Sequence, residues 1–223
     1  MKGDVTVVIT ACNRADLLIA TLDSFLKHNT YPIHQYIISE DSGIEGVNDA
    51  VKKRFSHLNI RWIEPDKRRG QIASIDEAYS FVETPYIFHC EEDWRFINSG
   101  FIELSKAVLQ FDPKIITVWL RGLNYEPNCH QPSHKFGTAN GVKFRYMATH
   151  FRGVWHGFTF NPGLRRLSDY KKIAPYGKYT NFDRTKPHES EMMLSKVHYQ
   201  RGFRAATLLE PFVTHIGANR HVS

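Results

Sequence analysis

Three consecutive carboxylates follow an apolar run in the stretch Tyr86-Ile-Phe-His-Cys-Glu-Glu-Asp-Trp94. The run follows Pro85 and predicts a buried strand. Glu91, Glu92 and Asp93 then stand at the rim of a sheet, where α/β proteins bind ligands. Neighbouring carboxylates repel one another, so they favour a hard divalent cation with oxygen ligands. Taken alone, the stretch is explained equally well by a solvated acidic loop.

The elements before this stretch alternate between strand and helix. This order is typical of βαβ units with right-handed crossovers and a parallel sheet. The carboxyl ends of parallel strands meet at one edge, so residues 10–13, Glu40 with Asp41, and residues 91–93 should lie together. The predicted strands are residues 5–10, 36–38, 59–63 and 86–89, and the predicted helices are residues 14–27, 47–55 and 72–82.

The second half has a less regular pattern. Residues 122–162 are rich in Gly, Pro, Asn, His and aromatics, and we interpret them as loops and short strands around a pocket. Further helices are predicted at residues 98–111, 164–173 and 189–200, and further strands at residues 114–120, 142–147, 155–160 and 204–208.

The composition limits the class of protein. The chain has 223 residues, of which 42% are hydrophobic and 23% charged, as in soluble globular domains. The apolar runs are too short for a transmembrane segment, and the N-terminal residues do not resemble a signal peptide. Three cysteines form neither a disulfide framework nor a zinc spacing. We therefore expect a cytoplasmic protein, with the inner face of the membrane as a further location.

The net charge of +6 indicates an anionic partner. Nucleic acid, an anionic membrane surface in peripheral contact, or a pocket for phosphates would each account for it. The sequence has no RNA-binding or helix-turn-helix signature, so we favour phosphates and expect no nucleic-acid partner.

A series of motifs then resembles a nucleotide-sugar-dependent glycosyltransferase of the A-type fold, most similar to family 2 and its inverting relatives. The resemblance implies a Rossmann-like, mostly parallel central sheet flanked by helices, with a smaller mixed sheet on the acceptor side. It implies a single domain over residues 1–223, in which residues 1–97 bind the nucleotide sugar and residues 98–223 bind the acceptor and catalyse. The motifs are Val7-Val-Ile-Thr-Ala-Cys-Asn-Arg14, Ile38-Ser-Glu-Asp-Ser-Gly43, Gly70-Gln-Ile-Ala-Ser-Ile-Asp-Glu-Ala78, Cys90-Glu-Glu-Asp-Trp94, Glu189-Ser-Glu-Met-Met-Leu-Ser-Lys-Val-His-Tyr-Gln-Arg-Gly202 and His215-Ile-Gly217.

The resemblance also implies a divalent metal that neutralises the leaving diphosphate. Its usual motif is Asp-x-Asp or Glu-Asp-Asp, whereas this chain has Glu-Glu-Asp. Asp93 is therefore the principal ligand that we carry over, with His215 as a late ligand and Glu91 as a weaker one. A histidine ligand favours Mn²⁺ over Mg²⁺. An ordinary core or surface histidine is the alternative for His215.

Donor contacts are implied for the strand ends and for three arginines. Asp41 would accept a hydrogen bond from the uracil edge, with Glu40 as its neighbour, although Asp is also common as a cap or turn residue. Guanidinium groups suit phosphates, although some of these arginines could equally be surface charges. The donor residues implied are Thr10, Ala11, Asn13, Arg14, Asp41, Glu40, Arg69, Glu92 and Arg220.

The helix that ends in Gly202 carries the implied catalytic base. Counting back from that glycine selects Glu191, with Glu189 in reserve. A carboxylate that deprotonates the acceptor hydroxyl contributes ~10²–10⁴-fold in rate, and a single base implies inversion. A first-turn acid favoured by the helix dipole is the alternative. Trp155, His156 and Trp94 could form a wall for sugar rings, against the alternative of core packing.

The function predicted from these motifs is transfer of a sugar from a nucleoside-diphosphate sugar, UDP in the first instance, to a hydroxyl of a glycan or glycoconjugate. A nucleotidyltransferase is an alternative, but such enzymes usually open with a Gly-rich phosphate loop, where this chain has Thr10-Ala-Cys-Asn-Arg14. A non-catalytic nucleotide-sugar or glycan-binding domain of the same fold is the other.

Overall fold

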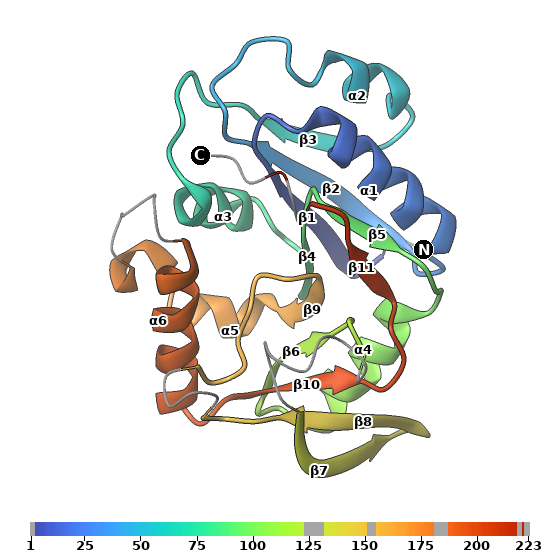
Figure 1. Cartoon of the computed structure of the whole chain (residues 1–223), viewed down its shortest axis with the longest axis vertical. Helices are drawn as coiled ribbons and strands as arrows, with labels where there is room; N and C mark the ends of the chain where they lie inside the picture. The colour runs from blue at the N-terminus through green and yellow to red at the C-terminus, as the bar shows by residue number, and fades with distance from the viewer. Residues whose placement is uncertain (1–2, 123–131, 151–154, 181–186, 218–219, 221–223) are drawn as a thin grey trace.

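The computed structural model describes residues 3–122, 132–150, 155–180, 187–217 and 220 (Figure 1). The strands are β1 (Val5–Ala11), β2 (Ile33–Glu40), β3 (Ile60–Ile63), β4 (Tyr86–Glu91), β5 (Trp94–Phe96), β6 (Ile115–Trp119), β7 (Pro132–Ala139), β8 (Val142–Met147), β9 (Gly163–Arg166), β10 (Arg204–Leu208) and β11 (Val213–His215). The helices are α1 (Ala15–His28), α2 (Asp49–Arg54), α3 (Gln71–Ser80), α4 (Phe101–Phe111), α5 (Leu167–Lys171), the 3₁₀ turn η1 (Tyr176–Tyr179) and α6 (Pro187–Gln200).

The first four strands form the parallel part of the main sheet, in the order β3-β2-β1-β4. Every residue of β1 is buried, because helices cover both faces of a central parallel strand. Thr10 pairs with Glu91 on one side and with Ser39 on the other, so the three strands end level. The alternation predicted for this half is confirmed, and its polar strand ends share one edge.

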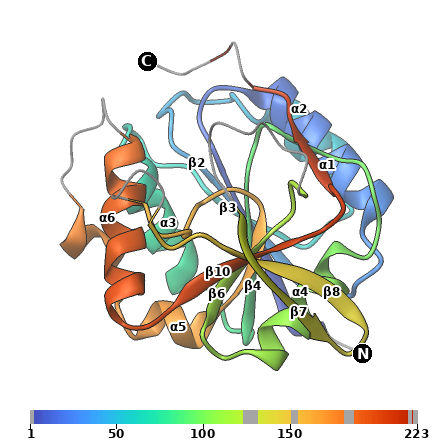
Figure 2. The same cartoon turned by 60° about the horizontal axis from the view of Figure 1, so that its bottom comes forward.

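The rest of the main sheet is mixed. In the described residues its full order is β3-β2-β1-β4-β9-β6-β10-β8-β7. β9 runs antiparallel to both β4 and β6, and β8 runs antiparallel to β10 (Figure 2). The fold class is confirmed as α/β, but the mixed strands continue the central sheet. The separate small sheet is instead the pair β5 and β11.

Two local predictions were wrong. Gly163–Arg166 belongs to β9, and the helix predicted over residues 164–173 begins only at Leu167. Residues 163–166 are a strand because they pair with both β4 and β6. The close approach to β6 requires glycine at position 163, since a Cβ there would lie 2.7 Å from the Val118 carbonyl oxygen. Residues 155–160 form no strand ladder within the described chain, because Gly157 has φ +98° and leaves extended geometry.

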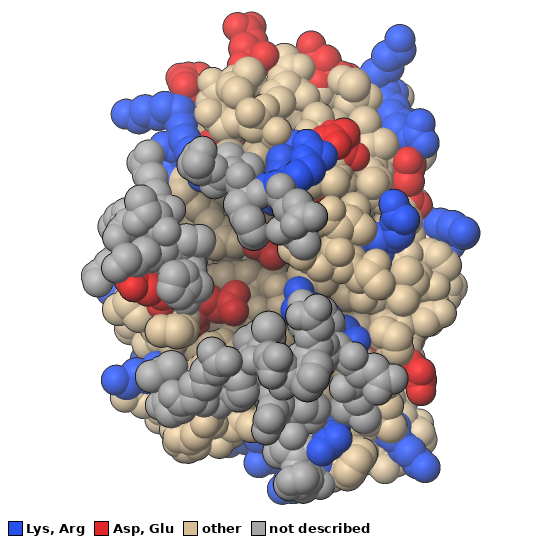
Figure 3. Space-filling model, in the orientation of Figure 1, with Lys and Arg blue, Asp and Glu red and all other residues tan. Residues whose placement is uncertain are grey.

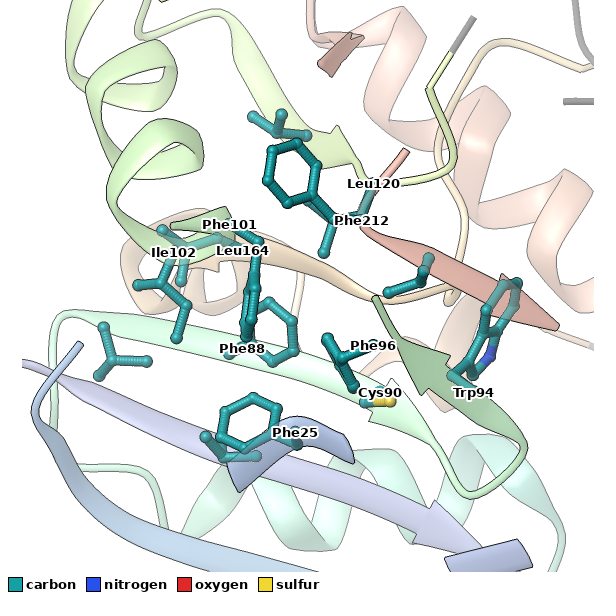
Figure 4. Packing of buried hydrophobic residues seen from close by; sticks show 14 of the residues in the cluster. Phe25, Phe88, Cys90, Trp94, Phe96, Phe101, Ile102, Leu120, Leu164 and Phe212 are labelled. Carbon is teal, nitrogen blue, oxygen red and sulfur yellow. The ribbon is translucent and has the colours of Figure 1, made fainter. Parts of the chain in front are cut away.

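The core has one large apolar cluster on each face of the sheet and a smaller third cluster of Trp119, Met147, Trp155 and Ala205. On one face, α1, α4 and the small sheet pack on the strands, and Figure 4 shows Phe25, Phe88 and Phe101 meeting there. On the other face, α3, α5, η1 and α6 pack on the sheet. The strand ends are therefore held from both sides. Within the described residues, none of the helices is long and apolar enough to cross a membrane.

Candidate active site

The acidic turn between β4 and β5 is fixed by its neighbours. The Thr21 hydroxyl of α1 donates to the Glu92 carbonyl oxygen at 2.5 Å and accepts from the Trp94 amide at 3.2 Å. The Glu92 amide donates to the Thr10 carbonyl oxygen of β1 at 3.1 Å. The turn is thus tied to a helix and to a central strand, which gives its carboxylates a fixed position. Figure 3 shows acidic side chains within a hollow on the face seen in Figure 1.

Arg14 joins the ends of β1 and β4. Its Nε donates to Glu92 Oε1 at 2.7 Å, and its Nη1 lies 2.9 Å from Asp93 Oδ2. The Cys12 amide also donates to Glu92 Oε1, at 3.1 Å. Burial raises the pKa of Glu92, and Arg14 opposes that rise. Burial alone would lower the pKa of Arg14, but the two carboxylates outweigh it and raise that pKa.

Asp93 also meets the late histidine. Nε2 of His215 lies 3.2 Å from Asp93 Oδ2, and the Ile216 amide donates to the Asp93 carbonyl oxygen at 2.9 Å. Burial favours a higher pKa for Asp93, but the hydrogen bond to His215 and the charge of Arg14 outweigh it and lower the pKa. The Asp93 side chain is therefore a carboxylate at neutral pH.

The predicted metal ligands are only partly gathered. Asp93 and His215 are in contact, whereas Glu91 accepts a hydrogen bond from the Gln71 amide nitrogen of α3 at 2.7 Å. Among the described residues, no three His, Cys, Asp or Glu side chains are grouped to hold a metal. Asp93 Oδ1 is buried without a hydrogen-bond partner in the described chain. One carboxylate and one imidazole fit an ion whose other ligands come from phosphate and water.

Glu91 points to the opposite face of the sheet from Cys90, because side chains alternate along a strand. There it lies within the electrostatic reach of Glu191 on α6. Burial, and then the carboxylates of Asp93, Glu92 and Glu191, raise the pKa of Glu91 to about 8. Glu91 at the end of β4 and Glu191 near the start of α6 thus influence each other electrostatically, although 100 positions separate them in the sequence.

Glu191 stands in the first turns of α6. Its Oε2 accepts a hydrogen bond from the Phe160 amide at 3.0 Å, and the Thr159 hydroxyl bonds the same carboxyl group. Burial raises the pKa of Glu191, and these hydrogen bonds oppose the rise only in part. Glu189 is two positions earlier on the helix, so it projects from a different side. The Glu191 carboxylate lies beside the Thr159–Phe160 segment, and the choice of Glu191 over Glu189 as the base stays a prediction.

The carboxylates of Glu40, the last residue of β2, and of Asp41, the next residue, accept hydrogen bonds from backbone amides of neighbouring loops. The Glu40 carboxylate accepts from the Asn13 amide at 2.6 Å and from the Ser42 hydroxyl at 2.7 Å. The Asp41 carboxylate accepts from the amides of Arg69 and Gly70, at 2.9 and 2.6 Å. Asp41 thereby fixes the loop that leads into α3, which agrees with the alternative role of a cap or turn residue. Base recognition by either acid stays a prediction.

The remaining donor residues lie around this edge. Arg69 pairs with Glu77 of α3, and the Ala11 carbonyl oxygen accepts from the Asp41 amide at 2.9 Å. The Arg220 guanidinium pairs with Asp16, and its carbonyl oxygen accepts from Arg14 Nη1 at 3.1 Å. The tail therefore reaches the acidic turn through Arg14.

The predicted sugar wall is mostly buried. Trp94 is 1% exposed and packs under His215, with ring centroids 4.9 Å apart. Trp155 packs edge-on against Trp119 at 5.2 Å, and His156 stacks on Tyr199 at 4.4 Å. These contacts agree with the packing alternative for the two tryptophans.

Four residues of the site went unrecognised in the sequence. Thr21 is an ordinary helix residue by pattern, Gln71 lies in the Gly70–Ala78 motif just before the predicted helix, and Arg165 lies inside a wrongly predicted helix. Gly217 is the last residue of the His215-Ile-Gly217 motif, and the sequence alone does not show why a glycine is needed there. A Cβ there would lie 2.3 Å from Asp93 Oδ2, so only glycine lets the tail pass over Asp93. A glycine two positions after the late histidine is the one signal that could have been used.

Solved structures with this fold include glycosyltransferases. TarS of S. aureus matches with a TM-score of 0.66 and 12% identity over 96% of this chain and 36% of that one. Residues 1–349 of TarS in complex with UDP-GlcNAc give 0.66 and 13% over 100% of this chain and 62% of that one. The mannosyltransferase PcManGT from Pyrobaculum calidifontis, in complex with GDP-Man and Mn²⁺, gives 0.64 and 15% over 95% and 55%.

At these identities the likeness shows the A-type glycosyltransferase fold, and the chain spans less than two thirds of each of these proteins. No curated protein matches the sequence. The model of the family described as Glycosyl transferase family 2 matches residues 6–171, well over half of the chain. Because this match covers most of the chain, the chain belongs to glycosyl transferase family 2.

Proposed function

We propose that this domain transfers a sugar, with inversion, from a UDP-sugar to a hydroxyl group of a glycan or glycoconjugate. The observation that carries the proposal is the meeting of Asp93, His215 and Arg14 at one sheet edge, with Glu191 in electrostatic reach of the end of β4. The complexes of TarS with UDP and UDP-GlcNAc and of PcManGT with GDP-Man support a nucleotide-sugar donor. Residues 1–97 would bind the donor, and residues 98–223 would bind the acceptor.

The donor end of the reaction needs positive charge. Asp93 and His215 would hold a divalent ion, with Mn²⁺ preferred, and that ion would neutralise the charge of the leaving diphosphate. Asp93 suits this role because its lowered pKa keeps it ionised. Arg14 spans Glu92 and Asp93 and adds a fixed cation at the same edge. The Mn²⁺ in the PcManGT complex supports the choice of metal.

The acceptor end needs a base. Glu191 would take the proton of the acceptor hydroxyl as its oxygen attacks the anomeric carbon. Burial raises the pKa of Glu191, which brings the carboxylate closer to the range where a general base works best at neutral pH. Attack assisted by one base on the face opposite the diphosphate inverts the anomeric centre.

A thermal-shift experiment tests this function. The protein is melted with UDP, UDP-GlcNAc and GDP-Man, each with and without Mn²⁺. A ligand that binds the folded state raises the free energy of unfolding, by about 2.7 kcal/mol when its concentration is a hundred times Kd, and so raises the melting temperature. We expect the UDP ligands to stabilise the protein only with Mn²⁺. A shift with GDP-Man alone would overturn the choice of uracil as the nucleobase of the donor. No shift with any of the three ligands would overturn the function.

Two variants control this experiment. Asp93→Asn should lose the Mn²⁺-dependent part of the shift, because it removes the charge that holds the ion. Asp23→Asn is the matched control, since Asp23 is a surface carboxylate paired with Arg54 on the outer helices. Donor binding without release of UDP from UDP-GlcNAc, in the presence of candidate glycan acceptors, would favour the non-catalytic binding domain.

A further inference from the structure

Arg165 is a buried cation behind the proposed base. It lies on β9 and is 1% exposed. Its guanidinium stands over the rings of Phe158 and Phe160, at 5.3 and 5.7 Å from the centroids. Aromatic faces attract a cation. This attraction is smaller than the several kcal/mol that removing a charge from water costs, so the buried Arg165 needs a further stabilising contact.

The hydrogen bond that links Arg165 to Glu191 goes through a single peptide group. Its Nη2 donates to the Thr159 carbonyl oxygen at 3.1 Å. The amide of that same peptide belongs to Phe160 and donates to Glu191 Oε2 at 3.0 Å. Cation, peptide dipole and carboxylate are therefore aligned head to tail. A chain of hydrogen bonds of this kind polarises each member, so Arg165 strengthens the bond from Phe160 to Glu191.

Within the part of the chain that the structure describes, no carboxylate pairs with Arg165, and the Tyr79 hydroxyl is a further polar group beside its guanidinium. Nε and Nη1 of Arg165 have no hydrogen-bond partner there, and no carboxylate lies within ion-pair distance. The positive charge of Arg165 instead acts on Glu191 and counters the burial that raises its pKa.

Other charged groups also face Glu191 from the elements around it. Arg121, after β6, lowers its pKa as well, while Glu91 at the end of β4 and Glu191 repel each other. Glu189 stands on the same helix. Arg165 differs from all of these because it is joined to Glu191 through one peptide.

We infer that Arg165 is a positioning residue for Glu191, which acts through the Thr159–Phe160 peptide. By fixing Oε2 it orients the carboxylate, so that the other oxygen can take the proton of the acceptor hydroxyl. The inference deepens the proposed function and rests on it for the role of Glu191. The link between Arg165 and Glu191 can nevertheless be measured without any turnover.

The experiment is a carbon-13 NMR titration of the glutamate side-chain carboxyls. Loss of one signal in Glu191→Gln assigns Glu191. Arg165→Met removes the cation but keeps an unbranched side chain, so the pKa of Glu191 should rise by about one unit. Arg166→Met is the matched control. Arg166 is the next residue of β9, and it donates to the Ile115 carbonyl oxygen at 2.9 Å, away from Glu191. In this control the pKa of Glu191 should not move.

A second variant covers the case in which Arg165→Met does not fold. Arg165→Lys keeps a buried charge but loses the planar fork. It should move the amide resonance of Phe160, and kcat for release of UDP from UDP-GlcNAc should fall about tenfold with KM unchanged, roughly 1.4 kcal/mol. An unchanged pKa of Glu191 in folded Arg165→Met, or an unmoved Phe160 resonance in Arg165→Lys, would overturn the inference.

The two proposals can fail separately. If Glu191→Gln retains full turnover, the base assignment is wrong, while the NMR titration still decides whether Arg165 acts on Glu191. If Glu191 is the base and Arg165 acts only through it, then Arg165→Met should cause no further loss of kcat in the Glu191→Gln background. An equal loss in both backgrounds would mean that Arg165 acts on turnover independently of Glu191.

Discussion

The two acidic regions of the site handle charge in opposite ways. At the turn after β4, Arg14 contacts the carboxylates of Glu92 and Asp93 directly, and the His215 ring also lies against Asp93. At the start of α6, Glu191 meets Arg165 only through a peptide. The pKa of Asp93 is accordingly lowered, whereas the pKa of Glu191 is raised by burial. In the proposed function, Asp93 in the first region keeps its charge and Glu191 in the second region exchanges a proton.

The largest expected effect breaks the second region. With the nucleotide sugar that the thermal-shift experiment identifies as the donor, Glu191→Gln should lower the release of the nucleotide by ~10²–10⁴-fold, because the amide cannot take a proton. The donor-dependent thermal shift should remain, since the donor edge is intact. Glu189→Gln is the matched control and should change turnover only a few-fold. A result in which Glu189→Gln is the inactive variant would move the base to the earlier glutamate.

The next effect breaks the first region. Arg14→Met leaves Glu92 and Asp93 buried without their arginine, so the free energy of unfolding in urea should fall by about 3 kcal/mol. Arg54→Met is the matched control, because the pair of Arg54 with Asp23 is 54% and 42% exposed. An exposed pair contributes below about 1 kcal/mol. Equal losses for the two variants would contradict the view that the acidic turn depends on its cation.

Acid should weaken the protein through buried histidines near the second region. Burial lowers the pKa of His198 to about 3, and burial with the charge of Arg165 lowers that of His89. Both rings are neutral when folded and take up protons on unfolding below about pH 6.5. The free energy of unfolding therefore falls as the pH drops, by up to about 1.4 kcal/mol per pH unit for each histidine.

Replacing one of these histidines tests that source of acid sensitivity. His198→Phe keeps the ring contacts with Phe158 and Phe203 and should flatten the decline between pH 6 and pH 4 in urea titrations. His57→Gln, at an exposed position, should leave the slope unchanged. An identical slope in wild type and His198→Phe would assign the acid sensitivity to other groups.

The smallest effect sharpens the first region without removing a charge. Gly217→Ala puts a Cβ where Asp93 Oδ2 now lies, so the tail must shift away from the turn. Asp93 and His215 then separate, and the Mn²⁺-dependent affinity for UDP should weaken roughly tenfold in calorimetry. Thr214→Ala, at an exposed position of β11, is the control in the same segment and should bind UDP as wild type does.

The parallel half could be predicted from the sequence because its signals are local. Continuous β-branched runs give its central strands, and Leu18, Leu22 and Phe25 of α1 repeat at helical spacing. Strand ends of a parallel sheet share one edge, so the neighbourhood of Thr10, Glu40 and Glu91 follows from topology. The meeting of Asp93 with His215 came from the family resemblance.

The second half resisted prediction because distant contacts decide it. Arg165 reads as a helix residue until Leu164 on β9 is paired with Phe88 and Val118. The segment before it lacks a ladder because its amides bind side chains of α6: those of His156 and Phe158 go to the Ser195 hydroxyl, and that of Phe160 goes to Glu191. No periodicity encodes such bonds, so the partner of the proposed base was not visible.

The place of β9 has a consequence for how the chain is made. Phe88 of β4 pairs with Leu164, a separation of 76 positions. β6 gains β9 at the same point of synthesis and its other neighbour, β10, later still. Until residue 166 has left the ribosome, one edge of β4 has no strand to bind. Long-range pairing is slow, and open apolar edges attract other chains. Aggregation during synthesis should therefore depend on how soon the four residues Gly163–Arg166 pair with β4 and β6, which are synthesised before them.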